Sequence, residues 1–200
     1  MRIGIIGAGK VGRTLAARFV AVGHDVLVAS KRGPERLRGR LAGVDSRLSP
    51  ASVIEACGCD MVVLAVPWPK IGEALPDGID WGGRILVDAT NIFLSYEPDF
   101  RVDDLKGDSG SEKVSRMARS ARTVKAFNTL PIDTMFAPLA AGFRRVLFLA
   151  GDDPAAVGEV AQRVTELGLH PVALGSLATA GRQMELNGPL SGLELLTPVD

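Results

Sequence analysis

The sequence has few of the residues on which several kinds of catalytic and structural site depend. Its 200 residues include two cysteines, Cys57 and Cys59, and two histidines, His24 and His170. Two thiols in a C-x-C spacing can build neither a disulfide framework nor a four-ligand zinc site. No HExxH, GxSxG or EF-hand pattern occurs. The sequence therefore predicts two reduced thiols, no metal site and no serine nucleophile.

Net charge and long apolar runs are lacking as well. The chain carries 23 Lys+Arg against 23 Asp+Glu, and this balance argues against binding of nucleic acid over a whole surface. The longest apolar runs, such as residues 61–67, are far shorter than the ~20 residues that span a bilayer. The first residues enter a strand pattern without the features of a signal peptide. We therefore expect a soluble, cytoplasmic protein with neither nucleic-acid nor membrane partners.

What the sequence does contain is a regular alternation of strand-like and helical segments. Hydrophobic residues make up 46% of the chain, which is enough for a sizeable core. Strand patterns cover residues 2–6, 26–29, 61–66, 85–88, 123–127, 145–150 and 172–174, and helical patterns cover 11–22, 50–56, 71–75, 114–121, 154–167 and 177–186. Residues 92–110 have the composition of a long surface loop. This alternation predicts a Rossmann-like, doubly wound and mostly parallel α/β sheet with helices on both faces.

The sharpest local signal is a G-x-G-x-x-G turn made of Gly7, Ala8, Gly9, Lys10, Val11 and Gly12. It follows a strand pattern and opens an amphipathic helix, which is the context of a dinucleotide-binding turn. Gly7 allows the tight turn, Gly9 presents no Cβ to a pyrophosphate, and Gly12 lets the helix approach the strand. A competing G-x-x-x-x-G-K pattern from Gly4 to Lys10 lacks the hydroxyl residue that would bind magnesium. We therefore predict a dinucleotide-binding core over residues 1–122, and a small C-terminal α/β part over 123–200 that completes the sheet and the acceptor pocket within one compact unit.

Residues after the second strand pattern indicate which dinucleotide binds. An NAD site usually has an acid at this position, whereas this chain has Ser30, Lys31 and Arg32. Residues 31–47 contain six basic residues, Arg36 among them, and two acids. Guanidinium groups and a hydroxyl suit a dianionic 2′-phosphate. We therefore predict NADP(H) as the cofactor, with Ser30, Lys31, Arg32 and Arg36 in its site.

Several further motifs carry a resemblance to a known family. They are the 7–12 turn, Ala29-Ser30-Lys31-Arg32, Leu64-Ala65-Val66-Pro67-Trp68, Val87-Asp88-Ala89-Thr90-Asn91, Val124-Lys125-Ala126-Phe127-Asn128-Thr129, Ala150-Gly151-Asp152-Asp153 and Leu174-Gly175-Ser176-Leu177. In this order and spacing the chain resembles the NADP oxidoreductases that use the deazaflavin coenzyme F420, and related dinucleotide-binding reductases. The resemblance extends over nearly the whole chain.

The resemblance implies direct hydride transfer between NADPH and a second planar ring, most simply a deazaflavin co-substrate. It assigns Val66 and Pro67 to the cofactor site, together with Ala126. It further implies a hydride-transfer pocket that contains Trp68, Asn91, Phe127, Asn128, Thr129, Ser176 and Leu177. No acid–base pair is assigned, because such a transfer depends on the placement of two rings.

Other interpretations remain open. The acceptor can instead be an imine, a ketone, a flavin or a metal chelate, and a non-catalytic NADPH-sensing module has the same sequence features. The resemblance implies a homodimer, for which the apolar stretch 137–141 and the C-terminal segment are candidate contacts. Acidic residues gather at 97–112, near the expected site of the small-molecule acceptor; they are Glu97, Asp99, Asp103, Asp104, Asp108 and Glu112.

Overall fold

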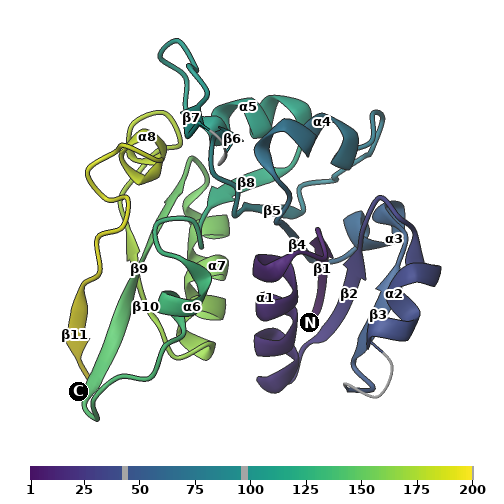
Figure 1. The fold of residues 1–200 in the computed structure, drawn as a ribbon, viewed down its shortest axis with the longest axis horizontal. Helices are drawn as coiled ribbons and strands as arrows, with labels where there is room; N and C mark the ends of the chain where they lie inside the picture. The colour runs from purple at the N-terminus through teal and green to yellow at the C-terminus, as the bar shows by residue number, and fades with distance from the viewer. Residues whose placement is uncertain (42–44, 96–98, 200) are drawn as a thin grey trace.

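A computed structural model of the chain describes residues 1–41, 45–95 and 99–199. Their main feature is a nine-stranded sheet in the order β10-β9-β8-β5-β4-β1-β2-β3, with β11 paired to β9 (Figure 1). The strands of this sheet are β1 (Arg2–Ile6), β2 (Asp25–Ala29), β3 (Leu48–Ala51), β4 (Met61–Leu64), β5 (Ile85–Asp88), β8 (Arg122–Lys125), β9 (Phe143–Gly151), β10 (His170–Ala173) and β11 (Leu196–Pro198). The helices are α1 (Lys10–Ala21), α2 (Pro34–Leu41), α3 (Val53–Cys57), the 3-10 turn η1 (Trp68–Lys70), α4 (Ile71–Ala74), α5 (Gly110–Met117), α6 (Ile132–Met135), α7 (Pro154–Glu166) and α8 (Ala180–Met184).

Six strands make the doubly wound half of the sheet. The order β3-β2-β1-β4-β5-β8 has parallel pairing at every step. From β1 the chain winds outward to β3, then crosses back to β4 on the other side of β1. The carboxyl ends of β1 and β4 therefore flank the point where the winding reverses, which is where ligands bind in open α/β sheets. The predicted fold class is confirmed.

The C-terminal strands extend this sheet in the opposite direction. β9 runs antiparallel to β8, β10 runs parallel to β9, and β11 runs antiparallel to β9. In Figure 1 these strands occupy the left side of the molecule, opposite α1 and β1 to β3. The expected division between residues 122 and 123 falls inside β8, a strand that pairs with both β5 and β9.

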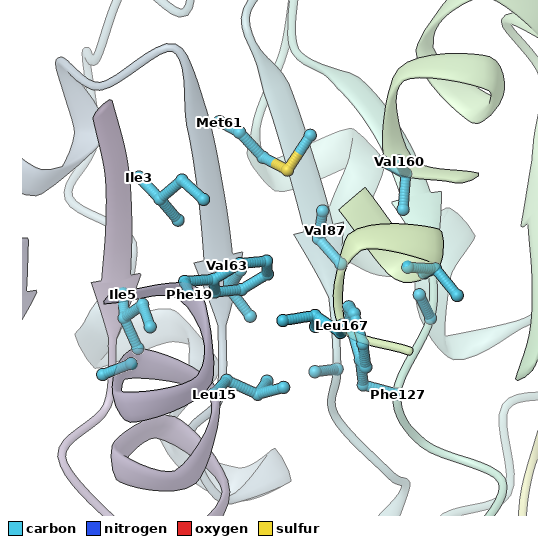
Figure 2. Packing of buried hydrophobic residues seen from close by; sticks show 14 of the residues in the cluster. Ile3, Ile5, Leu15, Phe19, Met61, Val63, Val87, Phe127, Val160 and Leu167 are labelled. Carbon is cyan, nitrogen blue, oxygen red and sulfur yellow. The ribbon is translucent and has the colours of Figure 1, made fainter. Parts of the chain in front are cut away.

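The largest hydrophobic cluster spans both parts of the sheet. Figure 2 shows Leu15 and Phe19 of α1 beside Ile3, Ile5 and Val63 of the parallel strands. Val160 of α7 and the following Leu167 belong to the same cluster. Leu15 and Phe19 are fully buried, as the four-residue spacing of the predicted helix requires. Gly23, at a φ of 95°, follows the end of α1.

One helix begins later in the structure than the sequence predicts. The helix expected from Pro50 begins at Val53, because Leu48–Ala51 forms the strand β3. Proline is tolerated there because β3 is the edge strand beyond β2. The true start has a capping box, in which the Ser52 side chain accepts the N–H of Glu55 and the Glu55 carboxylate accepts the N–H of Ser52.

Two further strand regions were not predicted. The segment expected to be a surface loop at 92–110 contains the small antiparallel sheet of β6 (Phe93–Ser95) and β7 (Arg101–Val102). The C-terminal strand β11 pairs with Phe143–Arg145 of β9. Strands of two or three residues are too short to show a period in the sequence. None of the helices formed by the described residues combines the length and the apolar character that crossing a bilayer requires.

The two thiols are expected to be unreactive in the folded protein. Cys57 ends α3, and both Cys57 and Cys59 are free and buried. Burial raises the pKa of the Cys57 thiol to about 11 and also raises the pKa of Cys59. Because the thiolate is the reactive form, the native protein should resist iodoacetamide at pH 8, whereas the urea-unfolded chain should gain two labels by intact mass. Rapid labelling of the native protein would contradict this expectation.

Candidate functional site

A pocket of ≈ 550 Å³ lies at the carboxyl ends of β1, β2 and β4. The pocket therefore lies where the winding of the sheet reverses. Nine of the residues predicted to bind the cofactor line this pocket: Gly7, Ala8, Gly9, Ser30, Lys31, Arg32, Arg36, Val66 and Pro67. The pocket therefore joins the glycine turn, the basic segment after β2 and the loop after β4 in one cavity.

Each glycine of the turn meets a different steric requirement. Gly7 has a φ of 119°, and a Cβ built on it would lie 2.2 Å from the Ala65 carbonyl oxygen. A Cβ on Gly12 would lie 1.8 Å from the Gly7 carbonyl oxygen. A Cβ on Gly9 would meet nothing within 4 Å. Gly7 and Gly12 are thus required by the fold itself, whereas Gly9 keeps open a space that protein atoms do not fill.

The N-terminus of α1 faces this open space without a side-chain cap. Gly9 is the N-cap residue, and a glycine has no side chain that could accept a hydrogen bond from the first turn. The first N–H groups of a helix lack partners within the helix and carry the positive end of its dipole. An anion over Gly9 would accept hydrogen bonds from these N–H groups.

The basic segment after β2 forms one rim of the pocket. The Ser30 hydroxyl accepts the backbone N–H of Arg32 at 3.3 Å, which gives the segment a tight turn directly after the strand. Arg32 and Arg36 are exposed, and neither has an ion-pair partner among the described residues. Both guanidinium groups are therefore available to a phosphate at this rim.

Glu73 is a pocket residue that the sequence analysis missed. Its carboxylate accepts hydrogen bonds from Lys70 at 2.8 Å and from Lys31 at 3.2 Å. These two ammonium groups lower the pKa of Glu73, so the carboxylate is charged at neutral pH. The charged lining residues are then Lys31, Arg32, Arg36 and Lys70 against Glu73, and positive charge still prevails. No spacing in the sequence links Glu73 to Lys31, because they lie 42 residues apart.

Four residues predicted to bind the cofactor lie outside the lining of the pocket. Lys10 is exposed and forms an ion pair with Asp133 of α6. Val11 is half-buried and packs against the main core. Gly12 and Ala126 are buried, and the N–H of Ala126 donates to the Asp88 carbonyl oxygen at 3.1 Å. These residues support the turn and the end of β8.

The predicted asparagines meet at the carboxyl ends of β5 and β8. Asn91 Nδ2 donates to the backbone carbonyl of Asn128 at 2.8 Å, and Asn128 Nδ2 donates to Asn91 Oδ1 at 3.2 Å. Asn128 Nδ2 also donates to the Met184 carbonyl at 2.7 Å, which fixes the orientation of the amide. Asn128 Oδ1 is buried and has no partner in the described part of the chain. An unpartnered buried oxygen is costly, so a ligand that donates a hydrogen bond would stabilise this site.

The remaining predicted residues of the hydride-transfer pocket lie in different surroundings. Trp68 is half-buried, and its Nε1 donates to Asp103 at 2.8 Å. Thr129 is buried directly after Asn128. The Ser176 hydroxyl bonds to that of Thr179 at 2.9 Å. Leu177 is buried, and its N–H donates to Asp152 at 3.0 Å.

The ring of Phe127 requires a correction. It was expected to edge the hydride-transfer site, but it is 3% exposed and packs edge-on against Phe19 at a centroid distance of 6.4 Å. The ring belongs to the core cluster shown in Figure 2. A φ of 61° turns the backbone at this point. Any contact of Phe127 with a ligand would therefore come from its backbone.

A buried polar network beside the asparagines was not predicted. Asp88 and Lys125, the last residues of β5 and β8, are fully buried and pair at 3.3 Å. Asp88 also accepts hydrogen bonds from the hydroxyls of Ser111 at 2.5 Å and Thr90 at 2.6 Å. Lys125 Nζ further donates to the Thr90 carbonyl at 3.4 Å. The Asp and Lys stand inside two of the family-like motifs, but no local spacing signals that they pair.

Glu185 adds a second buried carboxyl to this region. It is 5% exposed and accepts the backbone N–H of Gly110, the first residue of α5. Burial raises the pKa of Glu185, and the positive charge of Lys125 offsets part of that effect. Glu185 and Gly110 lie 75 positions apart, and no pattern in the sequence links them.

The residues of the pocket fit a phosphorylated dinucleotide. The space above Gly9 and the uncapped helix suit a pyrophosphate, while Arg32 and Arg36 suit a further phosphate at the rim. Asn128 Oδ1 offers an acceptor to a hydrogen-bond donor near the ends of β5 and β8. These are three separate features at the same edge of the sheet.

Two solved structures are similar to this chain over almost its full length. A hypothetical protein from Sinorhizobium meliloti is 38% identical with a TM-score of 0.88, and the match covers 98% of this chain and 96% of that one. A protein from Arthrobacter sp. FB24, for which F420-dependent NADP reductase activity has been suggested, is 28% identical with a TM-score of 0.80. That match covers 92% of this chain and 89% of the other.

A curated relative is much longer. The metalloreductase STEAP3 of Rattus norvegicus is 28% identical over 184 residues, a match that covers 92% of this chain and 36% of that protein. The chain thus spans about a third of the length of this relative. Residues 2–92 match the family model described as NADP oxidoreductase, coenzyme F420-dependent. Over residues 2–92 the chain therefore matches this family of NADP-dependent oxidoreductases.

Proposed function

We propose that this chain transfers a hydride between NADP(H) and a deazaflavin coenzyme of the F420 type. The observation that carries the proposal is the single pocket in which a glycine turn without an obstructing Cβ lies opposite a basic rim. The family description supports both the nucleotide and the acceptor.

In this proposal the two halves of the nucleotide lie on different parts of the edge of the sheet. The N–H groups of the 7–12 turn bind the pyrophosphate, and Ser30, Lys31, Arg32 and Arg36 bind the 2′-phosphate. Val66, Pro67 and the Ala126 backbone line the path toward the nicotinamide. When bound, NADPH supplies the hydride.

The chain's own contribution to the transfer is to hold two rings face to face. Trp68, Asn91, Asn128 and Thr129 surround the nicotinamide, with Asn128 Oδ1 as the acceptor for its carboxamide. Ser176 and Leu177, in the C-terminal part formed by residues 123–200, wall the acceptor. The link from Met184 to Asn128 supports this division of roles, because it ties the C-terminal part to the asparagine pair.

A spectroscopic assay tests the acceptor. Mixing the protein with NADPH and coenzyme F420 should bleach the visible deazaflavin band, and NADH should do so much more slowly. A folded sample that binds NADPH but leaves the band unchanged would exclude this acceptor. Reduction of a ferric chelate by that same sample would favour the alternative suggested by the metalloreductase relative.

Assembly as a homodimer stays a prediction. Large apolar side chains are exposed on β9 and the C-terminal segment, at Phe143, Leu193, Leu195, Leu196 and Val199. The C-terminal segment is one of the two regions expected to form the dimer contact.

A further inference from the structure

The buried ionisable groups near the N-terminus of α5 do not balance in charge. Asp88 and Lys125 are both fully buried and neutralise each other. Glu185 is a second carboxyl in the same region, and no further lysine or arginine pairs with it among the described residues. Its chain neighbour Arg182 donates to two backbone carbonyls, those of Ala178 and Gly107. An uncompensated buried charge is strongly unfavourable, so the balance favours a neutral, protonated Glu185.

The Glu185 carboxyl adjoins the proposed reaction site. A Cβ built on Gly110 would lie 2.9 Å from Glu185 Oε1 and 3.3 Å from Cη2 of Trp68, so the carboxyl and the indole flank the same point. On the other side, the preceding residue Met184 accepts the hydrogen bond from Asn128. The Glu185 carboxyl thus lies near Trp68, and its chain neighbour Met184 binds Asn128; the proposed function assigns both Trp68 and Asn128 to the nicotinamide. Only Oε1 has a protein partner in the described part of the chain.

We propose that Glu185 is the proton donor of the acceptor site. This inference rests on the proposed function, which assigns no acid. Transfer of a hydride from NADPH to the acceptor would carry two electrons and one proton and would leave NADP⁺. The conjugated acceptor takes the hydride on carbon and is left with an electron pair on a ring heteroatom. The Glu185 carboxylic acid transfers its proton to that atom and becomes a carboxylate, which takes a new proton from water. The acceptor gains two electrons and two hydrogens in total.

The titration of Glu185 supports this role. Burial raises its pKa, as does the repulsion by Asp88 and Glu112, whereas Lys125 and the Gly110 N–H act in the opposite direction. General acids work best when their pKa lies near the working pH. Because the folded chain holds this proton more tightly than the unfolded chain, the fold loses stability as pH rises from the ordinary glutamate value of 4.5 to the raised pKa.

The test compares Glu185→Gln with Glu159→Gln. The glutamine retains the size of the side chain and an oxygen for Gly110, but its amide has no acidic proton to transfer. Glu159 is an exposed residue of α7 that pairs with Arg122, remote from the proposed site. We expect Glu185→Gln to leave the NADPH dissociation constant unchanged and to slow deazaflavin reduction about a hundredfold or more below the wild-type pKa. The rate of the wild type should fall with rising pH, whereas that of Glu185→Gln should be flat. Glu159→Gln should behave as the wild type does.

Two measurements need neither cofactor nor acceptor. In the infrared spectrum of the free protein, the carbonyl band of a protonated carboxylic acid should persist above the ordinary glutamate pKa of 4.5 and should be lost in Glu185→Gln. The melting temperature of Glu185→Gln relative to the wild type should increase from pH 5 to pH 9, since only the wild type loses the stability linked to this proton. These two measurements establish whether Glu185 is protonated, and the pH dependence of the reduction rate distinguishes a proton donor from a protonated residue with a merely structural role.

Failure of this inference differs from failure of the proposed function. If the wild type reduces the deazaflavin and Glu185→Gln does so equally fast at every pH, the proton role is overturned and the acceptor stands. An infrared band that persists in Glu185→Gln also overturns it. If the wild type binds NADPH but reduces no deazaflavin, the proposed acceptor falls, and the proton role falls with it.

Discussion

Replacing Gly9 by alanine is expected to abolish most NADPH binding while the fold stays intact. A Cβ on Gly9 meets no protein atom within 4 Å, and the residue has extended backbone angles that alanine adopts readily. The methyl group would occupy the space over the N-terminus of α1, where the pyrophosphate is expected. Hydrogen bonds to charged groups contribute about 1.5–3 kcal/mol each. Loss of two of them corresponds to a dissociation constant raised by roughly two orders of magnitude or more.

Alanine at position 12 is instead expected to lower the stability of the fold. There the new Cβ would lie 1.8 Å from the carbonyl oxygen of Gly7, a backbone atom that cannot turn aside. Overpacking of this kind costs about 1–3 kcal/mol or more, and in a chain of this length each kcal/mol shifts the melting temperature by roughly 2–4 °C. Gly12→Ala should therefore melt several degrees lower or fail to fold.

Thermal melts and NADPH titrations of the two variants separate the two roles. Gly158→Ala is the matched control, since Gly158 lies on the exposed face of α7 with nothing within 4 Å. It should bind NADPH normally and melt at or slightly above the wild-type temperature, because alanine favours a helix. Normal NADPH binding by a folded Gly9→Ala variant would show that no pyrophosphate lies over this turn.

Exchanging Arg32 for glutamate should reverse the preference for the phosphorylated nucleotide. Arg32 lines the pocket next to Ser30 and has no acidic partner among the described residues. The substitution removes a guanidinium that can bind a phosphate in two contacts, and it places a negative charge there. We expect the NADPH dissociation constant to rise at least about a hundredfold, or roughly 3 kcal/mol. That of NADH should change little.

Arg38→Glu makes the same change of charge six positions further along the chain. Arg38 lies on α2, pairs with Glu35 at 2.8 Å and does not line the pocket. Its effect on NADPH should be small and should fade with added salt. Fluorescence titration with both nucleotides measures all four constants. Equal weakening of NADPH and NADH by Arg32→Glu would contradict the assignment of the 2′-phosphate.

The acidic segment 97–112 is less of an obstacle to an anionic acceptor than its composition indicates. Asp103 accepts the indole N–H of Trp68, Asp108 pairs with Arg116, and Glu112 closes the capping box of α5. Glu97 lies outside the described residues. These three carboxylates therefore have structural partners, of which Arg116 carries a compensating positive charge for Asp108.

The sequence by itself determined the nucleotide half of this protein. The physical reason is that its signals are local. The requirement for Gly7 and Gly12 arises between residues at most a few positions apart, or against the neighbouring strand. Strand–helix alternation fixes a parallel sheet, and the carboxyl ends of its strands meet at one edge. Ser30, Lys31 and Arg32 therefore had to lie near the glycine turn, and they do.

Only the tertiary structure decided the surroundings of the acceptor. The pairs Lys125–Asp88 and Glu185–Gly110 join residues 37 and 75 positions apart, and no periodicity encodes such contacts. The ring of Phe127 illustrates the same limit, because its motif predicted the position at the end of β8 but not that the ring enters the core beside Phe19. Whether a side chain faces a core or a cleft depends on what packs against it, and for this half of the site the packing partners come from the far end of the chain.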